Sequence, residues 1–197
     1  MAGLFARVFS LHPDWIERLT PNAPDARAAS TLVAAVQLSG QPAKAELLRA
    51  KFANSGFDDR LEIEFAGLPA HLEDLRIKTP THLDIFWGAS FADGDGRYVR
   101  PIIDYFADTS NTSEPVAIDI AKLVISMTGG PKDILAGLKD KYGEERARQM
   151  IYAATALWAI QSNSRQHEYV EQTTAKYIGD HPGTPATKAL SALTGIK

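Results

Sequence analysis

Apolar residues recur through most of the chain with the three- and four-residue spacing of amphipathic helices. Proline, aspartate or threonine stands where several of these segments begin, and glycine stands where several end, as helix caps require. The pattern predicts an all-α protein, a compact bundle of about eight to ten helices arranged in antiparallel hairpins.

The segment 79–107 has the highest density of large apolar side chains and predicts two helices joined by a tight turn. Gly94 suits the left-handed position that ends the first helix, and Asp95 can cap the second. A later helix that begins at Glu144 carries Trp158 on its apolar face. We expect Trp158 and one face of the first helix to anchor the core, the residues of that face being Leu83, Phe86, Trp87 and Phe91.

The period of the pattern changes between residues 58 and 78. Leu61, Ile63 and Phe65 alternate with two glutamates, and a similar alternation with basic residues follows before residue 78. Alternation of this kind is typical of strands, and opposite charges on the outer faces can pair across a hairpin. The sequence therefore predicts a short β-ribbon at 61–78, with irregular chain or another helix as the alternatives.

A chain of 197 residues is long enough to bury a core of its own, and we expect a single helical domain spanning 1–197. The polar stretch 108–114 is the best candidate for an internal boundary. Residues 114–127 are apolar on nearly all sides, which predicts a central buried helix. The run Gly129, Gly130, Pro131 is expected to break that helix.

Composition narrows the functional classes mainly by exclusion. The chain is 45% hydrophobic and 23% charged, as is usual for globular proteins, and it has no cysteine for disulfides or thiolate chemistry. Its formal net charge of −3 gives no basic surface for nucleic acid. No apolar run approaches the length of a transmembrane helix, and the N-terminal stretch lacks the features of a signal peptide. We therefore expect a cytoplasmic protein.

The sequence gives little support to metal or cofactor chemistry. Asp93, Asp95 and Asp104 have part of the spacing of a calcium loop. That loop needs an oxygen ligand and then a glycine where this chain has Arg97 and Tyr98. The five histidines are scattered, and the signatures of zinc proteases, phosphate loops and serine hydrolases do not occur in the sequence. We expect no metal and no cofactor.

A polar cluster at 161–169 separates two strongly apolar helical segments. Asn163 or Ser164 can cap the second of these helices, which would place the next three residues in its first turn. Helix N-termini favour anions, and arginine can hold a carboxylate or phosphate through two parallel hydrogen bonds. The cluster is therefore either a helix–helix corner or an anion-binding site whose candidate residues are Asn163, Arg165, Gln166 and His167.

Two segments carry motifs beyond the helical pattern: LDIFWGASFADGD at 83–95 and ALWAIQSNSRQHEYV at 156–170. Together they resemble a group of uncharacterised bacterial helical proteins. The resemblance implies bacterial origin and a helical fold, and it brings no established activity. It also implies that six residues are motif positions, namely Asp84, Trp87, Asp95, Asn163, Gln166 and His167. If the two segments meet in space, Asp84 and His167 would orient each other.

Two functional hypotheses follow. The first is a non-enzymatic protein-interaction or scaffold module that binds another protein or itself. Its exposed apolar patch would lie on the N-terminal helix or on the C-terminal helix that carries Leu190 and Leu193. The second is a small-molecule or anion binder, or an enzyme, whose pocket at the 163–167 corner is lined by Asp84, Arg165 and His167. The sequence carries no catalytic signature, which favours the first hypothesis.

Overall fold

The computed structural model describes residues 1–127 and 134–196, and these residues contain twelve α-helices, two short 3-10 helices and no strand. The all-α prediction is therefore confirmed for the described part of the chain. The contacts divide the chain into two compact units, Met1–Gly94 and Asp95–Lys197. The division falls at the predicted glycine turn and not in the polar stretch 108–114. Whether the whole chain unfolds as a single domain stays a prediction.

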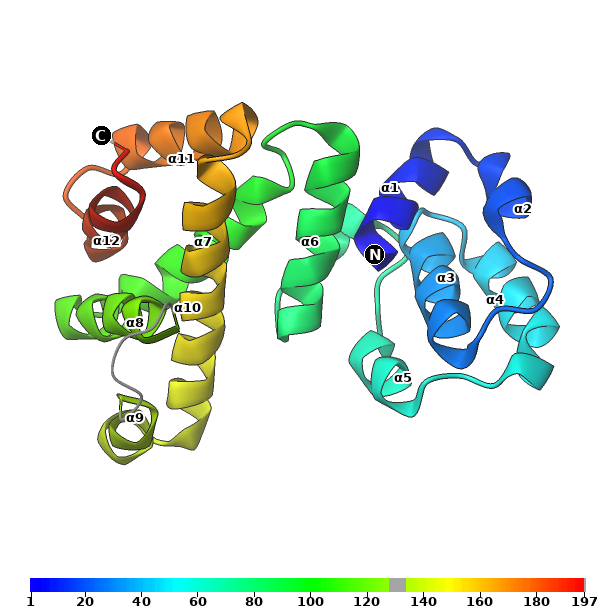
Figure 1. Cartoon of the computed structure of the whole chain (residues 1–197), viewed down its shortest axis with the longest axis horizontal. Helices are drawn as coiled ribbons and strands as arrows, with labels where there is room; N and C mark the ends of the chain where they lie inside the picture. The colour runs from blue at the N-terminus through cyan, green and yellow to red at the C-terminus, as the bar shows by residue number, and fades with distance from the viewer. Residues whose placement is uncertain (128–133, 197) are drawn as a thin grey trace. The chain divides into compact units, whose positions relative to one another are not determined.

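The first unit is built around its N-terminal helix. α1 packs against both α3 and α6, and α3 also packs against α4. Phe9 of α1 and Ala29 and Val36 of α3 are completely buried. The elements of this unit, coloured blue to green in Figure 1, are α1 (Ala2–Leu11), α2 (Trp15–Leu19), α3 (Ala26–Leu38), α4 (Pro42–Lys51), η1 (Ala53–Ser55), α5 (Asp59–Phe65), η2 (Leu72–Asp74) and α6 (Pro80–Asp93).

α1 and α6 approach so closely that their backbones touch at two glycines. A methyl group on Gly3 would lie 1.7 Å from the carbonyl oxygen of Ile85. A methyl group on Gly88 would lie 2.8 Å from the backbone nitrogen of Leu4. Any side chain at these positions would overlap backbone atoms, so the contact requires glycine.

An ion pair joins the same two helices. Arg7 Nε donates to Asp93 Oδ1 at 2.7 Å, and only 14% and 8% of the two side chains are exposed. Removing either partner would leave the other charge poorly solvated, which is strongly destabilising. Arg7 thereby engages Oδ1 of Asp93, the residue with which the calcium-loop spacing begins. Phe9 of this N-terminal helix is buried, whereas Leu4, Phe5 and Val8 are half-buried, so an interaction surface on this helix stays a prediction.

The predicted β-ribbon at 61–78 is not formed, because residues Asp59–Phe65 are the helix α5. Asp58 Oδ1 accepts the backbone N–H of Leu61 at 3.0 Å and so caps this helix. Leu61 and Phe65 share one helix face, while Ile63 is 78% exposed. Three alternating positions are too few to separate a strand from a helix, and the capping aspartate favours the helix.

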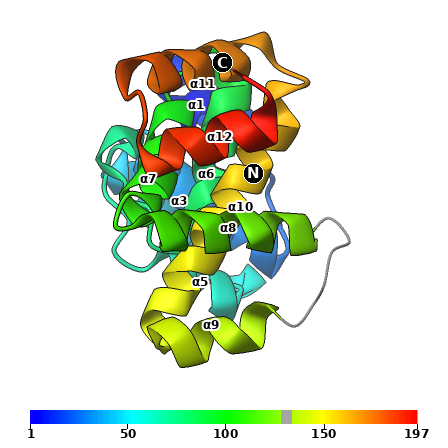
Figure 2. The ribbon, with the colours of Figure 1, turned by 90° about the vertical axis from the view of Figure 1, so that its left-hand side faces the viewer.

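The second unit is built around the 21-residue helix α10 (Glu144–Ser164). Met150, Leu157 and Ile160 form its completely buried face. Figure 2 shows α8 and α12 lying across it. The five helices that pack against α10 are α7 (Val99–Ser110), α8 (Glu114–Met127), α9 (Ile134–Tyr142), α11 (Glu168–Asp180) and α12 (Pro185–Thr194).

The polar stretch 108–114 is held firmly within the second unit. Asn111 Oδ1 accepts the backbone N–H of Ala186 at 3.0 Å, near the start of α12. Arg146 of α10 donates to the carbonyl oxygen of Thr109 at 2.9 Å, where α7 ends. These bonds satisfy backbone groups that helix ends leave unpaired. The polar composition therefore reflects capping rather than a flexible boundary.

The turn after α6 follows one sequence prediction and departs from another. Gly94 ends α6 in the left-handed conformation with φ of 67°, as predicted. Asp95 does not cap α7, which begins at Val99 without a side-chain cap. Asp95 Oδ1 instead accepts the N–H of Arg97 at 2.7 Å and stabilises the turn itself.

The expected aromatic anchors differ in burial. Trp87 is 7% exposed, and its ring stacks on that of Phe91 with the centroids 5.9 Å apart. Phe91 and Trp158 are 45% and 42% exposed, so the expectation that they are buried anchors is corrected. Helical spacing determines which residues share a face, but not how much of that face another helix covers.

α8 is buried on one side only. Ile120 is completely buried, whereas Ile118 and Ile125 are 49% and 52% exposed. The prediction of a central helix buried on all sides is therefore wrong, because several of its apolar residues project to solvent. Leu190 of α12 is completely buried and Leu193 is half-buried, so the predicted interaction surface on that helix stays a prediction. The predicted break at residues 129–131 lies outside the described residues.

In the described part of the chain, none of the helices combines the length and the apolar character that crossing a membrane requires.

Candidate functional site

The first unit contains a cavity of about 750 Å³ bounded by α1, α3, α5 and α6. This volume falls within the range of about 300–1,000 Å³ that small-molecule sites usually have. Helices from four separate stretches of chain contribute to the walls, so the cavity exists only when the unit is folded. Its larger apolar wall residues are Met1, Phe5, Leu19, Leu32, Leu61, Phe65 and Ile85.

Two aspartates of the cavity already have structural hydrogen bonds. Asp25 Oδ1 accepts the N–H of Ala28 at 2.7 Å and caps α3. Asp58 Oδ1 accepts the N–H of Leu61 and caps α5. Both residues line the cavity, and their carboxylates satisfy backbone donors at the two helix starts.

Two arginines of the cavity are placed differently. Arg27 and Arg60 each follow a capping aspartate by two residues, and both line the cavity while remaining exposed to solvent. They therefore lie at its mouth. Within residues 1–127 and 134–196, neither guanidinium makes an ion pair or a hydrogen bond. Their donors are available to a ligand.

Asp84 also lines this cavity. Part of its surface is exposed, yet the surrounding wall desolvates the carboxyl group and raises its pKa. The positive charge of the Met1 ammonium opposes that rise. Asp84 was a ligand-binding candidate from sequence, but the cavity on which it lies was not predicted. Asp84 belongs to the first unit and His167 to the second.

The arginines were missed by sequence reasoning, although a signal was present. An Asp-x-Arg sequence stands at the start of two helices. It is Asp25-Ala26-Arg27 at the start of α3 and Asp58-Asp59-Arg60 at the start of α5. Asp25 precedes a segment with helical spacing, whereas Asp58 lies just before the segment 61–78 that the sequence predicts as a ribbon. That both starts border one cavity depends on tertiary packing, which periodicity does not reveal.

The polar cluster at 161–169 forms a helix–helix corner in the second unit. α10 continues to Ser164, and His167 precedes α11 without a side-chain cap. The prediction that Asn163 or Ser164 caps the helix after the cluster, α11, is therefore wrong. Asn163 Nδ2 donates to the carbonyl of Ala159 at 2.9 Å, within its own helix. This back-bonding allows α10 to extend through the polar residues.

The other corner residues also bond locally or point to solvent. Gln166 Nε2 donates to the carbonyl oxygen of Ser162 at 3.1 Å, and Arg165 is exposed at the end of α10. Arg165, Gln166 and His167 thus connect the two helices instead of forming the first turn of α11. That first turn carries Glu168 and Glu171. Two carboxylates at this helix end disfavour a bound anion.

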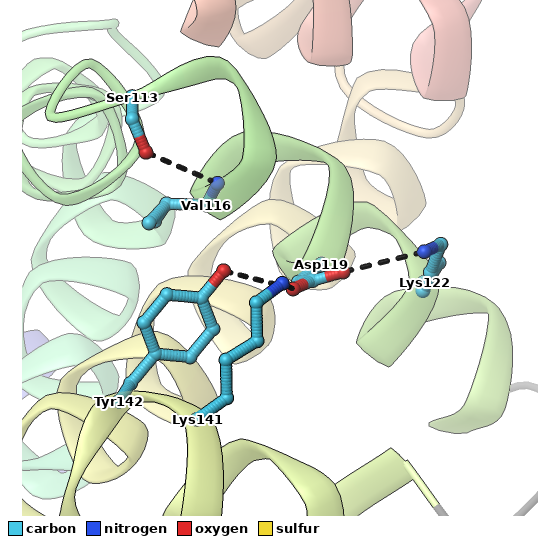
Figure 3. A network of polar contacts seen from close by, with 6 residues as sticks. All are labelled: Ser113, Val116, Asp119, Lys122, Lys141 and Tyr142. Carbon is cyan, nitrogen blue, oxygen red and sulfur yellow. Dashed lines mark hydrogen bonds and ion pairs between the residues drawn. The ribbon is translucent and has the colours of Figure 1, made fainter.

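A second polar cluster connects α8 with α9. Asp119 accepts hydrogen bonds from Lys141 Nζ at 2.7 Å and from Tyr142 Oη at 2.9 Å. Lys122 Nζ lies 3.3 Å from the other carboxylate oxygen. Figure 3 shows Lys141 and Tyr142 pointing from α9 toward this carboxylate on α8. Because Lys141 and Tyr142 of α9 both bond the Asp119 carboxylate of α8, we interpret the cluster as a clamp between the two helices.

The electrostatics of the clamp follow from these contacts. Partial desolvation alone would raise the pKa of the Asp119 carboxyl group. Hydrogen bonds from Lys141, Tyr142 and Lys122 outweigh that effect and lower the pKa below its ordinary value of 3.8. The hydrogen bond to Asp119 raises the pKa of Lys141 to about 12. The clamp therefore stays charged throughout the neutral range.

We expect Asp119→Asn to lower the free energy of unfolding at neutral pH by about 1 kcal/mol, because a charge-assisted hydrogen bond to Tyr142 is weakened. Asp119 has a lowered pKa in the folded state, so its contribution is present above pH 3.8 and is lost as the pH falls below that value. Urea unfolding of both proteins across this range should therefore converge in acid. Asp140→Asn, at an exposed position nearby, is the control. Equal stability of Asp119→Asn and the parent protein at neutral pH would contradict the clamp.

In the described residues, no three histidine or acidic side chains gather closely enough to hold a metal ion. Comparison of the chain with models of protein families, with curated proteins and with solved structures found no match. The resemblance of residues 83–95 and 156–170 to bacterial helical proteins therefore stays a prediction.

Proposed function

We propose that this protein binds a small organic molecule in the cavity of its first unit. The observation that supports this function is the combination of a 750 Å³ cavity, apolar walls and two unpaired guanidinium groups at its mouth. Small-molecule sites commonly pair an apolar interior with a few polar groups that orient the ligand. The proposal keeps the ligand-binding alternative drawn from the sequence, but it moves the site from the 163–167 corner to this cavity.

The residues of the cavity suit binding better than catalysis. The residues that line it include no histidine, lysine, serine or tyrosine. Asp25 and Asp58 are committed to backbone hydrogen bonds, which leaves Asp84 as the remaining carboxylate. Acid–base or nucleophilic catalysis usually needs two groups that work together within hydrogen-bonding distance. We therefore propose a non-enzymatic binding protein.

A substitution that fills the cavity tests the proposal. Ala28 lines the cavity from α3, so Ala28→Phe should occupy part of the space without removing the cap on its backbone N–H. Thermal unfolding is measured with decanol, decylamine, decanoate and decyl phosphate. We expect at least one probe to stabilise the parent protein, by about 2.7 kcal/mol at a hundred times its Kd. Ala28→Phe should abolish that stabilisation.

Ala43→Phe is the matched control, because Ala43 is exposed on α4 and does not line the cavity. This variant should respond to the probes as the parent protein does. Binding that persists in Ala28→Phe, or no response to any of the four probes, would contradict the proposed function.

The exposed face of α8 supports a second candidate function, self-association through an apolar surface. Ile118 and Ile125 lie seven residues apart on one face, and each exposes about half of its surface, at 49% and 52%. Met127 at the end of the helix is 50% exposed. Met127 lies on the other side of the helix, so the candidate surface consists of Ile118 and Ile125, and exposed apolar pairs of this kind are typical of interaction surfaces. This candidate retains the interaction hypothesis but replaces the two terminal helices as its surface.

Sedimentation velocity over a range of concentrations tests this candidate. We expect the parent chain to associate and Ile118→Lys to weaken association at least about tenfold, because a buried lysine loses its hydration. Ile63→Lys, at a 78% exposed position in the first unit, should change nothing. A parent protein that stays monomeric at every concentration would remove the candidate.

A further inference from the structure

We infer that the cavity of the first unit takes an amphipathic oxyanion, a carboxylate or phosphate on an apolar body, with Arg27 and Arg60 binding the anionic group. The inference rests on the proposed function and specifies the class of ligand. It depends on which polar groups of the cavity are already bonded and which remain available.

Arg27 and Arg60 are the principal available donors. Each lies at the cavity mouth, and neither is paired within the described residues. A guanidinium group presents parallel N–H donors that match the two oxygens of a carboxylate or the oxygens of a phosphate. Arg27 and Arg60 line the same cavity, so both can offer these donors to a ligand bound in it. A hydrogen-bonded ion pair between an oxyanion and a guanidinium group is therefore the polar contact that we expect a ligand of this cavity to make.

Formal charge alone does not select the ligand, because Asp25, Asp58 and Asp84 also line the cavity. Their bonding separates them from the arginines. Asp25 and Asp58 accept backbone N–H groups at 2.7 Å and 3.0 Å, so a ligand would have to compete with the caps. A cationic ligand would find one carboxylate, that of Asp84, with neither oxygen already bonded to a helix start. An anionic ligand meets two uncommitted donors.

The walls account for the apolar body. Phe5 from α1, Leu32 from α3 and Phe65 from α5 form part of the apolar wall of the cavity. Burial of a hydrocarbon chain against these residues supplies affinity that does not depend on charge. A free inorganic anion would gain none of this contribution. The ligand should therefore carry both an anionic group and a hydrocarbon portion.

Isothermal titration calorimetry with four matched probes tests the inference. Decanoate and decyl phosphate carry an oxyanion, decanol is neutral and decylamine is cationic. We expect at least one oxyanion to bind about tenfold more tightly than decanol, the difference that one charge-assisted hydrogen bond provides. Whichever of decanoate and decyl phosphate binds more tightly identifies the preferred oxyanion.

Arg27→Gln and Arg60→Gln should each weaken oxyanion binding about tenfold and leave decanol binding unchanged. Both side chains are exposed, so the variants should fold, and circular dichroism checks that they do. Arg76→Gln is the control, since Arg76 is an exposed arginine of the same unit that does not line the cavity.

The outcomes separate this inference from the proposed function. Decanol or decylamine binding as tightly as both oxyanions would overturn the inference while the cavity remains a binding site. Unchanged oxyanion affinity in both glutamine variants would overturn it in the same way. If none of the four probes binds, the inference and the proposed function both fail.

Discussion

The close contact between α1 and α6 is the constraint on which the first unit depends. Gly3 and Gly88 let the two backbones meet, and the nearly buried pair of Arg7 and Asp93 joins the same helices. α1 then provides Phe5 and α6 provides Ile85 and Asp84 to the cavity. If the helices moved apart to accommodate a side chain, the wall that these residues form would be displaced. The shape of the cavity is therefore coupled to a packing contact between two helices.

The polar side chains of each unit fall into two classes, those that already make hydrogen bonds within the protein and those whose donors are unused. Asp58, Asp119 and Asn111 each accept hydrogen bonds from the protein itself, where they cap a helix or join two helices. Satisfied groups of this kind stabilise the fold and leave little capacity for a ligand. Arg27 and Arg60 differ because nothing in the described residues uses their donors. This difference in bonding, more than charge, distinguishes a candidate site from a structural cluster.

The helical fold was predictable from sequence because the signals that mark a helix, apolar spacing and capping residues, lie within a few residues of one another. The spacing of apolar residues and the glycine at 94 gave the class and several helix ends. The prediction of a ribbon at 61–78 was wrong because a few alternating apolar residues fit both the two-residue period of a strand and the 3.6-residue period of a helix. The cavity was not predictable, since Arg27 and Arg60 lie 33 residues apart in the sequence and line one cavity only through tertiary packing. The corner at 163–167 attracted attention by composition, but its side chains bond mainly to backbone carbonyls.

The most direct measurement is the free energy of unfolding of Gly3→Ala beside that of Gly179→Ala. A methyl group at Gly179 of α11 meets open space, so alanine there should be neutral or stabilising by up to about 1 kcal/mol. At Gly3 the methyl group meets the Ile85 carbonyl, and the account predicts a loss of about 1–3 kcal/mol. If Gly3→Ala is as stable as Gly179→Ala, the two helices do not make the close contact on which the cavity depends.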